Sequence, residues 1–208
     1  MEHSAALRRA AGQVHGVALD GVDVEVAGRT DAAIARDLLL AAGVPDERID
    51  ERAADVEAAT VAAYAELCPP DLSARVAPGV PEALAALAAE PAVYRLALVT
   101  GNLEGVARRK LASAGLGDWF AAGQGGFGSD AEDRGALPAI ARARAGGWPR
   151  ERTVVIGDTP RDIACARVDR VRVIAVATGP FAAEALADAD AVVDDARAVL
   201  PVLADWAA

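Results

Sequence analysis

Aromatic residues, cysteines and basic residues are all scarce in this sequence of 208 residues. Tryptophan, tyrosine and phenylalanine together make up 4% of the chain. The two cysteines, Cys68 and Cys165, are too few for a disulfide framework, and they lack the spacing of a metal-binding motif. We therefore expect both thiols to be reduced and unligated.

The shortage of basic residues limits the kind of partner. Asp and Glu number 31 against 21 Lys and Arg, which gives a net charge of -10. Nucleic acids and membrane surfaces are bound through a basic footprint, so neither is expected as a partner. The sequence also has no run long enough to cross a membrane and no apolar signal-peptide core, so we expect a cytoplasmic protein.

Alanine, valine and leucine account for most of the 53% hydrophobic content, which suits helices packed on a sheet. Residues 1–75 predict helices only, whereas residues 76–208 alternate between strands and helices. The predicted helices of the first part span 4–11, 31–42 and 50–67. The predicted strands of the second part span 93–100, 121–128, 153–157, 171–177 and 191–193, and its predicted helices span 78–89, 103–114, 135–145, 161–167, 182–187 and 197–206. This alternation predicts a doubly wound parallel sheet that binds ligands at the carboxyl ends of its strands.

The first chemically interesting segment is Thr100-Gly101-Asn102, which follows a predicted strand and precedes a predicted helix. A phosphate there could accept hydrogen bonds from the Thr100 hydroxyl and from the backbone N–H groups of Gly101 and Asn102. The same three residues are also common as a plain strand exit and helix cap. The motif alone therefore does not decide between these readings.

A pair of acids follows the strand that ends at Gly157. Asp158 and Asp162 are four residues apart, so both can face one point from the first turn of a helix. Two neighbouring carboxylates repel one another unless a cation lies between them, and hard oxygen ligands suit Mg²⁺. The alternative is that both acids only cap the start of the helix.

A single basic residue lies between these two motifs. Arg134 precedes Asp158 by 24 positions and begins the intervening helix. By itself it would be read as a solvated surface charge. Three successive strand-to-helix junctions that offer a hydroxyl, a cation and an acid pair are much less probable by chance than any one of them. We therefore expect Thr100, Arg134, Asp158 and Asp162 to form one catalytic site.

These segments resemble the haloacid dehalogenase-like hydrolases, in particular the phosphoglycolate phosphatase-like group with a helical cap. The resemblance rests on residues 80–87, 96–102, 115–134 and 154–167. It implies that Thr100 and Arg134 bind phosphate, that Asp158 and Asp162 hold Mg²⁺, and that residues 1–75 form a cap over a core of residues 76–208. In such a cap, Arg29 would contact the substrate. The implied activity is hydrolysis of a small phosphorylated metabolite through an aspartyl-phosphate, by a monomer or homodimer.

One family feature has no counterpart in this sequence. Family members begin with an apolar strand that ends in Asp-x-Asp-Gly-Thr, and the nearest imitation, Asp20-Gly21-Val22-Asp23, has the wrong spacing. We therefore expect that the central first strand and its nucleophile are missing through a misplaced start codon, and that the chain is inactive without them. The alternatives are an inactive relative that acts as a binding or regulatory protein, or a haloacid dehalogenase or phosphosugar mutase of the same fold.

Overall fold

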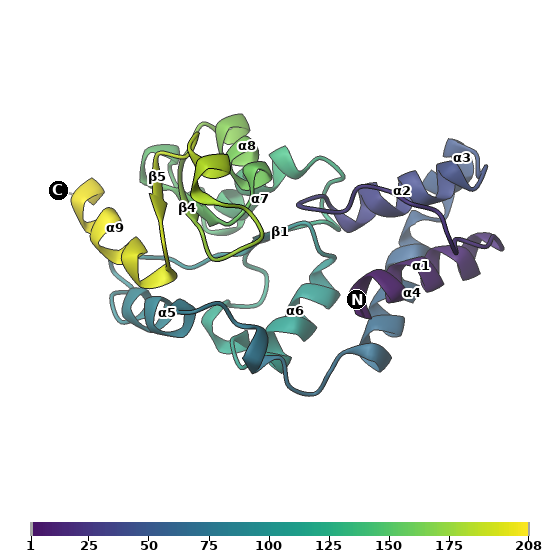
Figure 1. Ribbon diagram of the computed structural model, residues 1–208, viewed down its shortest axis with the longest axis horizontal. Coiled ribbons are helices and arrows are strands. Elements are labelled where there is room, and N and C mark those ends of the chain that lie inside the picture. The colour runs from purple at the N-terminus through teal and green to yellow at the C-terminus, as the bar shows by residue number, and fades with distance from the viewer. Residues whose placement is uncertain (1, 208) are drawn as a thin grey trace.

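The computed structural model describes residues 2–207 and shows a helical part beside an α/β part (Figure 1). The helical part consists of four helices: α1 (Glu2–His15), α2 (Asp31–Ala41), α3 (Asp46–Glu51) and α4 (Ala53–Leu67). Its apolar side chains make a core of their own, which includes Leu7, Leu38, Leu39 and Ile49. The expected helix over 50–67 is in fact two helices, because the backbone at Arg52 (φ -111°, ψ 10°) leaves the helical region.

The α/β part contains five helices and five strands among the described residues. The helices are α5 (Val80–Ala88), α6 (Glu104–Ser113), α7 (Leu137–Arg144), α8 (Pro160–Asp169) and α9 (Val199–Ala207). The strands are β1 (Val99–Thr100), β2 (Gly126–Phe127), β3 (Val154–Gly157), β4 (Arg172–Val176) and β5 (Ala191–Val193). All strand pairs are parallel, as expected for an α/β fold.

The single sheet that the sequence predicted is divided in two. β1 pairs only with β2, and β3, β4 and β5 pair in that order. Within residues 2–207, no backbone hydrogen bond joins the segment of β1 to that of β3. Val99 nevertheless packs against the apolar cluster around Val155, so the two sheets are neighbours with unpaired edges.

Burial of the strands reflects this division. β4 is buried from Val173 to Val176, whereas Ile156 in β3 is 45% exposed and residues 96–99 beside β1 are only half-buried. In a doubly wound parallel sheet the central strands are covered on both faces. The apolar side chains of β3 and of the segment before β1 therefore face a place where the sheet is incompletely covered.

Two expected strands are much shorter than predicted. The strand over 93–100 is confined to β1, and the strand over 121–128 is confined to β2. Gly123 and Gly125 have φ angles of +74° and +123°, which end an extended chain and form a turn instead. The segment before β1 has a partner on one side only, so it makes few of the ladder hydrogen bonds that define a strand.

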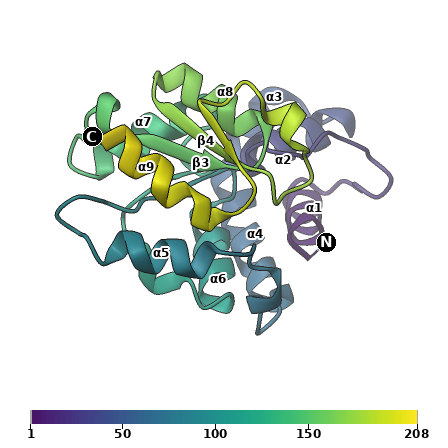
Figure 2. The ribbon, with the colours of Figure 1, turned by 60° about the vertical axis from the view of Figure 1, so that its left-hand side comes forward.

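Helices cover the three-stranded sheet (Figure 2). α8 packs on β3 and β4, with Ile163 and Ala166 buried against Val155 and Val173. α5 and α9 contact one another, so the first and last helices of the α/β part are neighbours. The expected helix over 182–187 is a 3₁₀ turn, Ala183–Leu186, and 3₁₀ turns also precede α7 and α9. No helix within residues 2–207 has the length and apolar character needed to cross a bilayer.

Candidate active site

Thr100 lies at the carboxyl end of β1, and its hydroxyl oxygen accepts a hydrogen bond from the Asn102 N–H at 3.2 Å. The next two N–H groups are also paired: Leu103 N–H donates to the Asp31 carboxylate at 2.8 Å and Glu104 N–H to the Ser129 hydroxyl at 3.3 Å. The expected contribution of the Asn102 N–H to a phosphate is thus replaced by a bond inside the loop. The hydroxyl hydrogen of Thr100 remains available to donate.

Three backbone segments meet at this loop without room for side chains. A Cβ atom on Gly101 would lie 2.1 Å from the Arg29 carbonyl oxygen, and one on Gly128 would lie 1.9 Å from the Gly101 carbonyl oxygen. Both distances are far below any real contact, so each position requires glycine. Gly101 was expected to matter for its N–H group, whereas the need for Gly128 was missed because nothing local in the sequence signals it.

Arg134 and Asp162 form an ion pair, with Nη2 2.5 Å from Oδ1. The other Asp162 oxygen, Oδ2, accepts from the N–H groups of Asp158 and Thr159 and from the Thr159 hydroxyl. Thr159 and Asp162 form a capping box at the start of α8. Asp162 is therefore engaged on both oxygens, while the buried Nε of Arg134 has no hydrogen-bond partner within residues 2–207.

Asp158 follows β3 directly and differs from Asp162 in its surroundings. Its side chain is half-buried; among the described residues it has no ion pair and no hydrogen bond to another side chain, and its carboxylate interacts with its own backbone N–H. Desolvation and the neighbouring Asp162 raise the pKa of Asp158 above its usual range. The loop after β4 closes on it, since a Cβ on Gly179 would lie 2.2 Å from an Asp158 carboxylate oxygen. Asp158 is thus an acid in a polar site that has no ion-pair partner among the described residues.

Replacing Asp158 with asparagine is expected to stabilise the protein at neutral pH. A raised pKa in the folded state means that folding takes up protons, so the charged form of Asp158 costs stability as the pH rises above the pKa of the unfolded state. Asp158→Asn should raise the melting temperature at pH 7 by a few degrees, on the order of 2–4 °C for each kcal/mol. Near pH 3, where the acid is protonated in both states, the melting temperatures of the two proteins should converge. A variant less stable than the wild type at pH 7 would contradict this reading.

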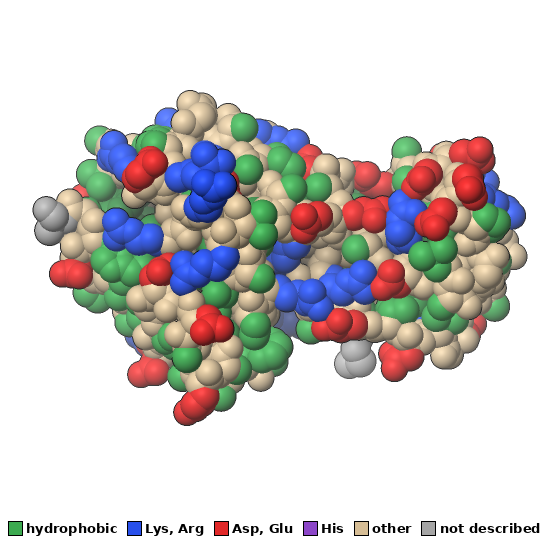
Figure 3. Space-filling model, turned by 90° about the horizontal axis from the view of Figure 1, so that it is seen from above, with side chains coloured by type: hydrophobic (Ala, Val, Ile, Leu, Met, Phe, Trp, Pro, Cys, Tyr) green, Lys and Arg blue, Asp and Glu red, His purple; other side chains and the backbone are tan. Residues whose placement is uncertain are grey.

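A cavity of about 240 Å³ lies where the helical part meets the α/β part. It is lined by Arg29 and Thr30 from the start of α2, by the segment 132–135 and by the outer side of α8, including Arg161. Basic side chains gather at this waist between the two parts (Figure 3). Arg29 and Arg134 both line the cavity, whereas Thr100 and Asp158 do not.

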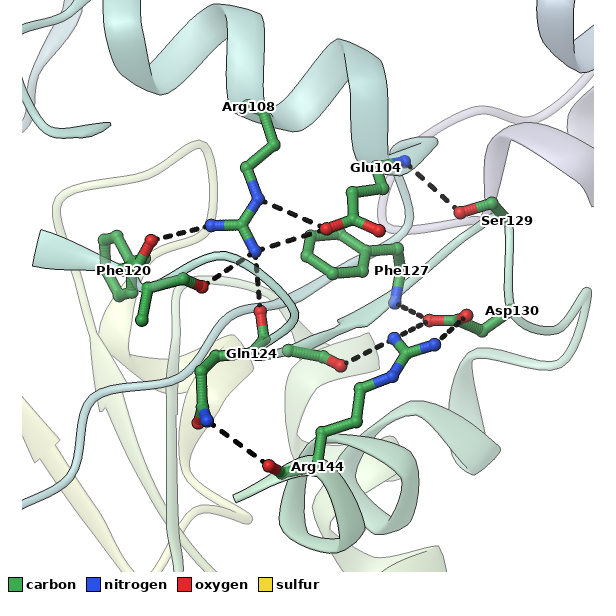
Figure 4. A network of polar contacts seen from close by, with 10 residues as sticks. Glu104, Arg108, Phe120, Gln124, Phe127, Ser129, Asp130 and Arg144 are labelled. Atoms are coloured by element: carbon green, nitrogen blue, oxygen red, sulfur yellow. Dashed lines mark hydrogen bonds and ion pairs between the residues drawn. The ribbon is translucent and has the colours of Figure 1, made fainter. Parts of the chain in front are cut away.

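A polar network around Arg108 fixes the turn that leads into β2 (Figure 4). Arg108 of α6 donates to the carbonyl oxygens of Phe120, Ala121 and Gln124 and pairs with Glu104. Its guanidinium lies 5.3 Å from the centre of the Phe127 ring. These contacts connect α6, which follows the Thr100 loop, to the turn before β2.

The donor set for a metal is incomplete in the described residues. Within residues 2–207 no three His, Cys, Asp or Glu side chains are grouped as a cation would require. Asp158 offers a free carboxylate, whereas Asp162 is committed to Arg134 and to the helix cap. These residues therefore do not by themselves fit a Mg²⁺ ion, which takes six near-octahedral oxygen ligands, some of them water.

Comparison with known proteins identifies the family. The profile described as haloacid dehalogenase-like hydrolase matches residues 22–167, which is more than half of the chain. The protein belongs to the haloacid dehalogenase-like hydrolase family. A second profile, described as HAD-hydrolase-like, matches residues 134–205. Family members typically use Mg²⁺. A search of curated proteins found no match.

Solved structures of haloacid dehalogenase-like proteins share this fold. β-Phosphoglucomutase from Clostridium difficile superposes with a TM-score of 0.67 at 16% identity, covering 99% of this chain and 90% of that one. A predicted phosphoglycolate phosphatase from Haemophilus somnus gives 0.62 at 19%, covering 97% and 90%. CbbY from Rhodobacter sphaeroides, solved in complex with phosphate, gives 0.54 at 20%, covering 94% and 89%. At these identities the likeness establishes the fold alone.

Proposed function

We propose that this haloacid dehalogenase-like protein is a phosphatase for a small phosphate monoester, with the phosphate bound at the carboxyl ends of β1 and β3. The observation that carries the proposal is the contrast at the end of β3. Asp158 has no ion-pair partner among the described residues and has a raised pKa, while Asp162 nearby is engaged by Arg134 and by the helix cap. Groups with a shifted pKa cluster at functional sites, because burial and neighbouring charges there adjust the pKa to the chemistry.

Each side chain has a distinct part in this proposal. The Thr100 hydroxyl donates to a phosphate oxygen, and the Arg134 guanidinium offsets the charge that spreads over the phosphoryl group. Asp162 acts through Arg134 by fixing its position. Asp158 is this chain's main contribution to a Mg²⁺ site, with Asp162 beside it, and further ligands are needed to complete that site.

The proposal further places the nucleophilic aspartate on an extended apolar segment lying between β1 and β3. Each of these strands has an edge without a strand partner in the described residues, the two sheets are neighbours, and adjacent strands need a spacing of about 4.8 Å. An inserted strand would lie beside the half-buried residues 96–99 on one edge and beside β3, with its exposed Ile156, on the other, and would reduce the exposure of both. Its carboxylate would attack phosphorus, releasing the alcohol, and water would then cleave the aspartyl-phosphate.

Specificity is assigned to the helical part. We propose that residues 1–75 act as a cap and that the organic portion of the substrate enters the 240 Å³ cavity. Arg29 lines this cavity and is held there by its ion pair with Asp37. A small phosphorylated metabolite fits these dimensions better than a macromolecule does.

The alternative function is binding without turnover. It is favoured by the absence, within residues 2–207, of a three-residue metal-ligand group. A binding protein of this kind would retain affinity for the phosphorylated ligand while hydrolysing none of it, even with Mg²⁺ and an inserted strand. The dehalogenase and mutase readings share the same scaffold and would differ in the substrate that turns over.

Binding of inorganic phosphate by the protein tests the proposed site directly. Thr100→Val keeps the shape of the side chain and removes the donor, so affinity measured by calorimetry should fall roughly ten- to hundredfold, since a hydrogen bond to a charged group contributes about 1.5–3 kcal/mol. Asp158→Asn removes a like charge and should strengthen phosphate binding in the absence of metal. The two substitutions, at the ends of β1 and β3, are therefore expected to change phosphate affinity in opposite directions.

Thr153→Val is the matched control, because Thr153 lies at the other end of β3, where its hydroxyl donates to the Pro149 carbonyl. It should leave phosphate affinity unchanged. If Thr100→Val and Asp158→Asn bind phosphate as the wild type does, the proposed site is wrong.

A further inference from the structure

We infer that two consecutive residues, Thr30 and Asp31, act as a bracket: they bind two loops of the α/β part and fix the distance between them. These are the Thr100 loop (residues 100–103) and the Arg134 loop (residues 129–134). The inference rests on the proposed function for its meaning, because those loops carry the candidate phosphate ligands. It gives the start of α2 a positioning role, separate from any contact with the substrate. In the sequence, both residues follow Arg29 at a boundary between a loop and a helix.

The first arm of the bracket is Asp31, whose side chain is 1% exposed. Its carboxylate accepts from Leu103 N–H at 2.8 Å and from the Asn102 side-chain amide at 3.4 Å, and it contacts the His3 ring nitrogen at 2.9 Å. Its own N–H donates to the Gly101 carbonyl at 2.7 Å. Asp31 therefore caps α6 from another part of the chain and grips the loop that follows Thr100.

The second arm is Thr30, which is also 1% exposed. Its hydroxyl donates to the Glu132 carbonyl at 2.7 Å and accepts from Ala33 N–H at 3.2 Å. Arg36, one turn further along α2, reinforces this arm because its Nε lies 2.9 Å from both carboxylate oxygens of Glu132. The segment that leads into Arg134 is thereby tied to α2.

A partly buried polar cluster next to Asp31 holds the side chain of Asn102 in place. Lys110 donates to the Asn102 side-chain oxygen at 2.6 Å and lies 5.7 Å from the centre of the Tyr64 ring. Burial lowers the pKa of Lys110, and the charge of Asp31 acts in the opposite direction. His3 packs edge-on against the same ring, with centroids 5.8 Å apart. Asn102 is thus oriented by an acid on one side and a cation on the other.

The geometry has a mechanical consequence. Thr30 and Asp31 are neighbours in sequence, so the spacing of their two core loops is set by a single peptide unit at the start of α2. A shift of α2 would move the Thr100 loop and the Arg134 loop together. Small misplacements of groups that bind a reacting phosphate reduce catalysis strongly, so such coupling is useful at this place.

Amide hydrogen exchange and phosphate affinity of the full chain test the bracket. Asp31→Ala should speed exchange of the Leu103 amide at least tenfold and weaken inorganic phosphate binding about tenfold. Asp31→Asn keeps an oxygen acceptor for Leu103 N–H and should restore most of both. Thr30→Val should speed exchange in residues 129–134 while leaving Leu103 protected.

Asp55→Ala, which removes an exposed acid on α4 paired with Arg52, is the control and should change neither readout. Unchanged phosphate affinity in folded Asp31→Ala, or unchanged exchange of Leu103, would overturn the bracket. Failure of the wild type to bind phosphate would instead refute the proposed function, and the exchange data would still decide whether the two loops are tied to α2.

Discussion

Alanine at position 128 is expected to lower the free energy of unfolding by about 2–4 kcal/mol, the range of severe overpacking and strain. The new methyl group would lie 1.9 Å from the carbonyl oxygen of Gly101, and that atom belongs to the backbone and cannot rotate away. Gly101→Ala should be similarly damaging, because its methyl group would lie 2.1 Å from the Arg29 carbonyl oxygen. Chemical denaturation of the purified variants measures both losses.

The matched control for these two glycines is Gly117→Ala. Its Cβ would meet only ordinary contacts, the nearest at 3.5 Å, and its φ angle is not in the left-handed region. Its free energy of unfolding should stay within about 0.5 kcal/mol of the wild type, as for a typical surface change. Equal stabilities for all three variants would show that the helical part is not pressed against the Thr100 loop.

Arg134→Met is expected to cost about 3–5 kcal/mol of unfolding free energy, as does removal of one partner from a buried ion pair. Arg134 is 18% exposed and Asp162 only 8%, so the orphaned Asp162 carboxylate would lose its countercharge in a poorly solvated place. The double variant Arg134→Met/Asp162→Asn should recover much of this loss, because the Asp162 carboxylate that lost its countercharge is then also removed. A double-mutant cycle measured by denaturation gives the coupling energy of the pair.

The exposed pair Arg52–Asp55 serves as the comparison for that cycle. Arg52→Met should change the free energy of unfolding by no more than about 1 kcal/mol, since surface ion pairs contribute little. Similar losses for Arg134→Met and Arg52→Met would mean that Asp162 is well solvated. In that case its proposed role in positioning Arg134 would have to be abandoned.

The residues that sequence reasoning found are those with a local signature. Thr100 and Asp158 each follow a Val-rich or Leu-rich strand at a helix start, a pattern that can be read without the fold. The sequence analysis placed both acids at a metal site and kept helix capping as the alternative for both. The capping-box spacing of Thr159-Pro160-Arg161-Asp162 favours that alternative for Asp162 alone.

Other features could not be predicted because they join distant parts of the chain. Asp31 caps a helix that begins more than seventy positions later, and Gly128 is fixed by the carbonyl of Gly101. The parallel fold was anticipated from the alternation of strands and helices, but the lengths of β1 and β2 were not. The length of a strand depends on which neighbouring strand its edge pairs with, and that pairing is decided by the tertiary structure.

The most direct test of the account is hydrolysis of p-nitrophenyl phosphate by the chain preceded by an apolar segment ending in Asp-x-Asp-Gly-Thr. We expect turnover with Mg²⁺, loss of turnover with EDTA, and new protection of the amides in β1 and β3 as the segment pairs with both edges. Changing the first added aspartate to asparagine should abolish turnover but keep the protection. Protection of both strands without any hydrolysis would contradict the phosphatase assignment and favour binding without turnover.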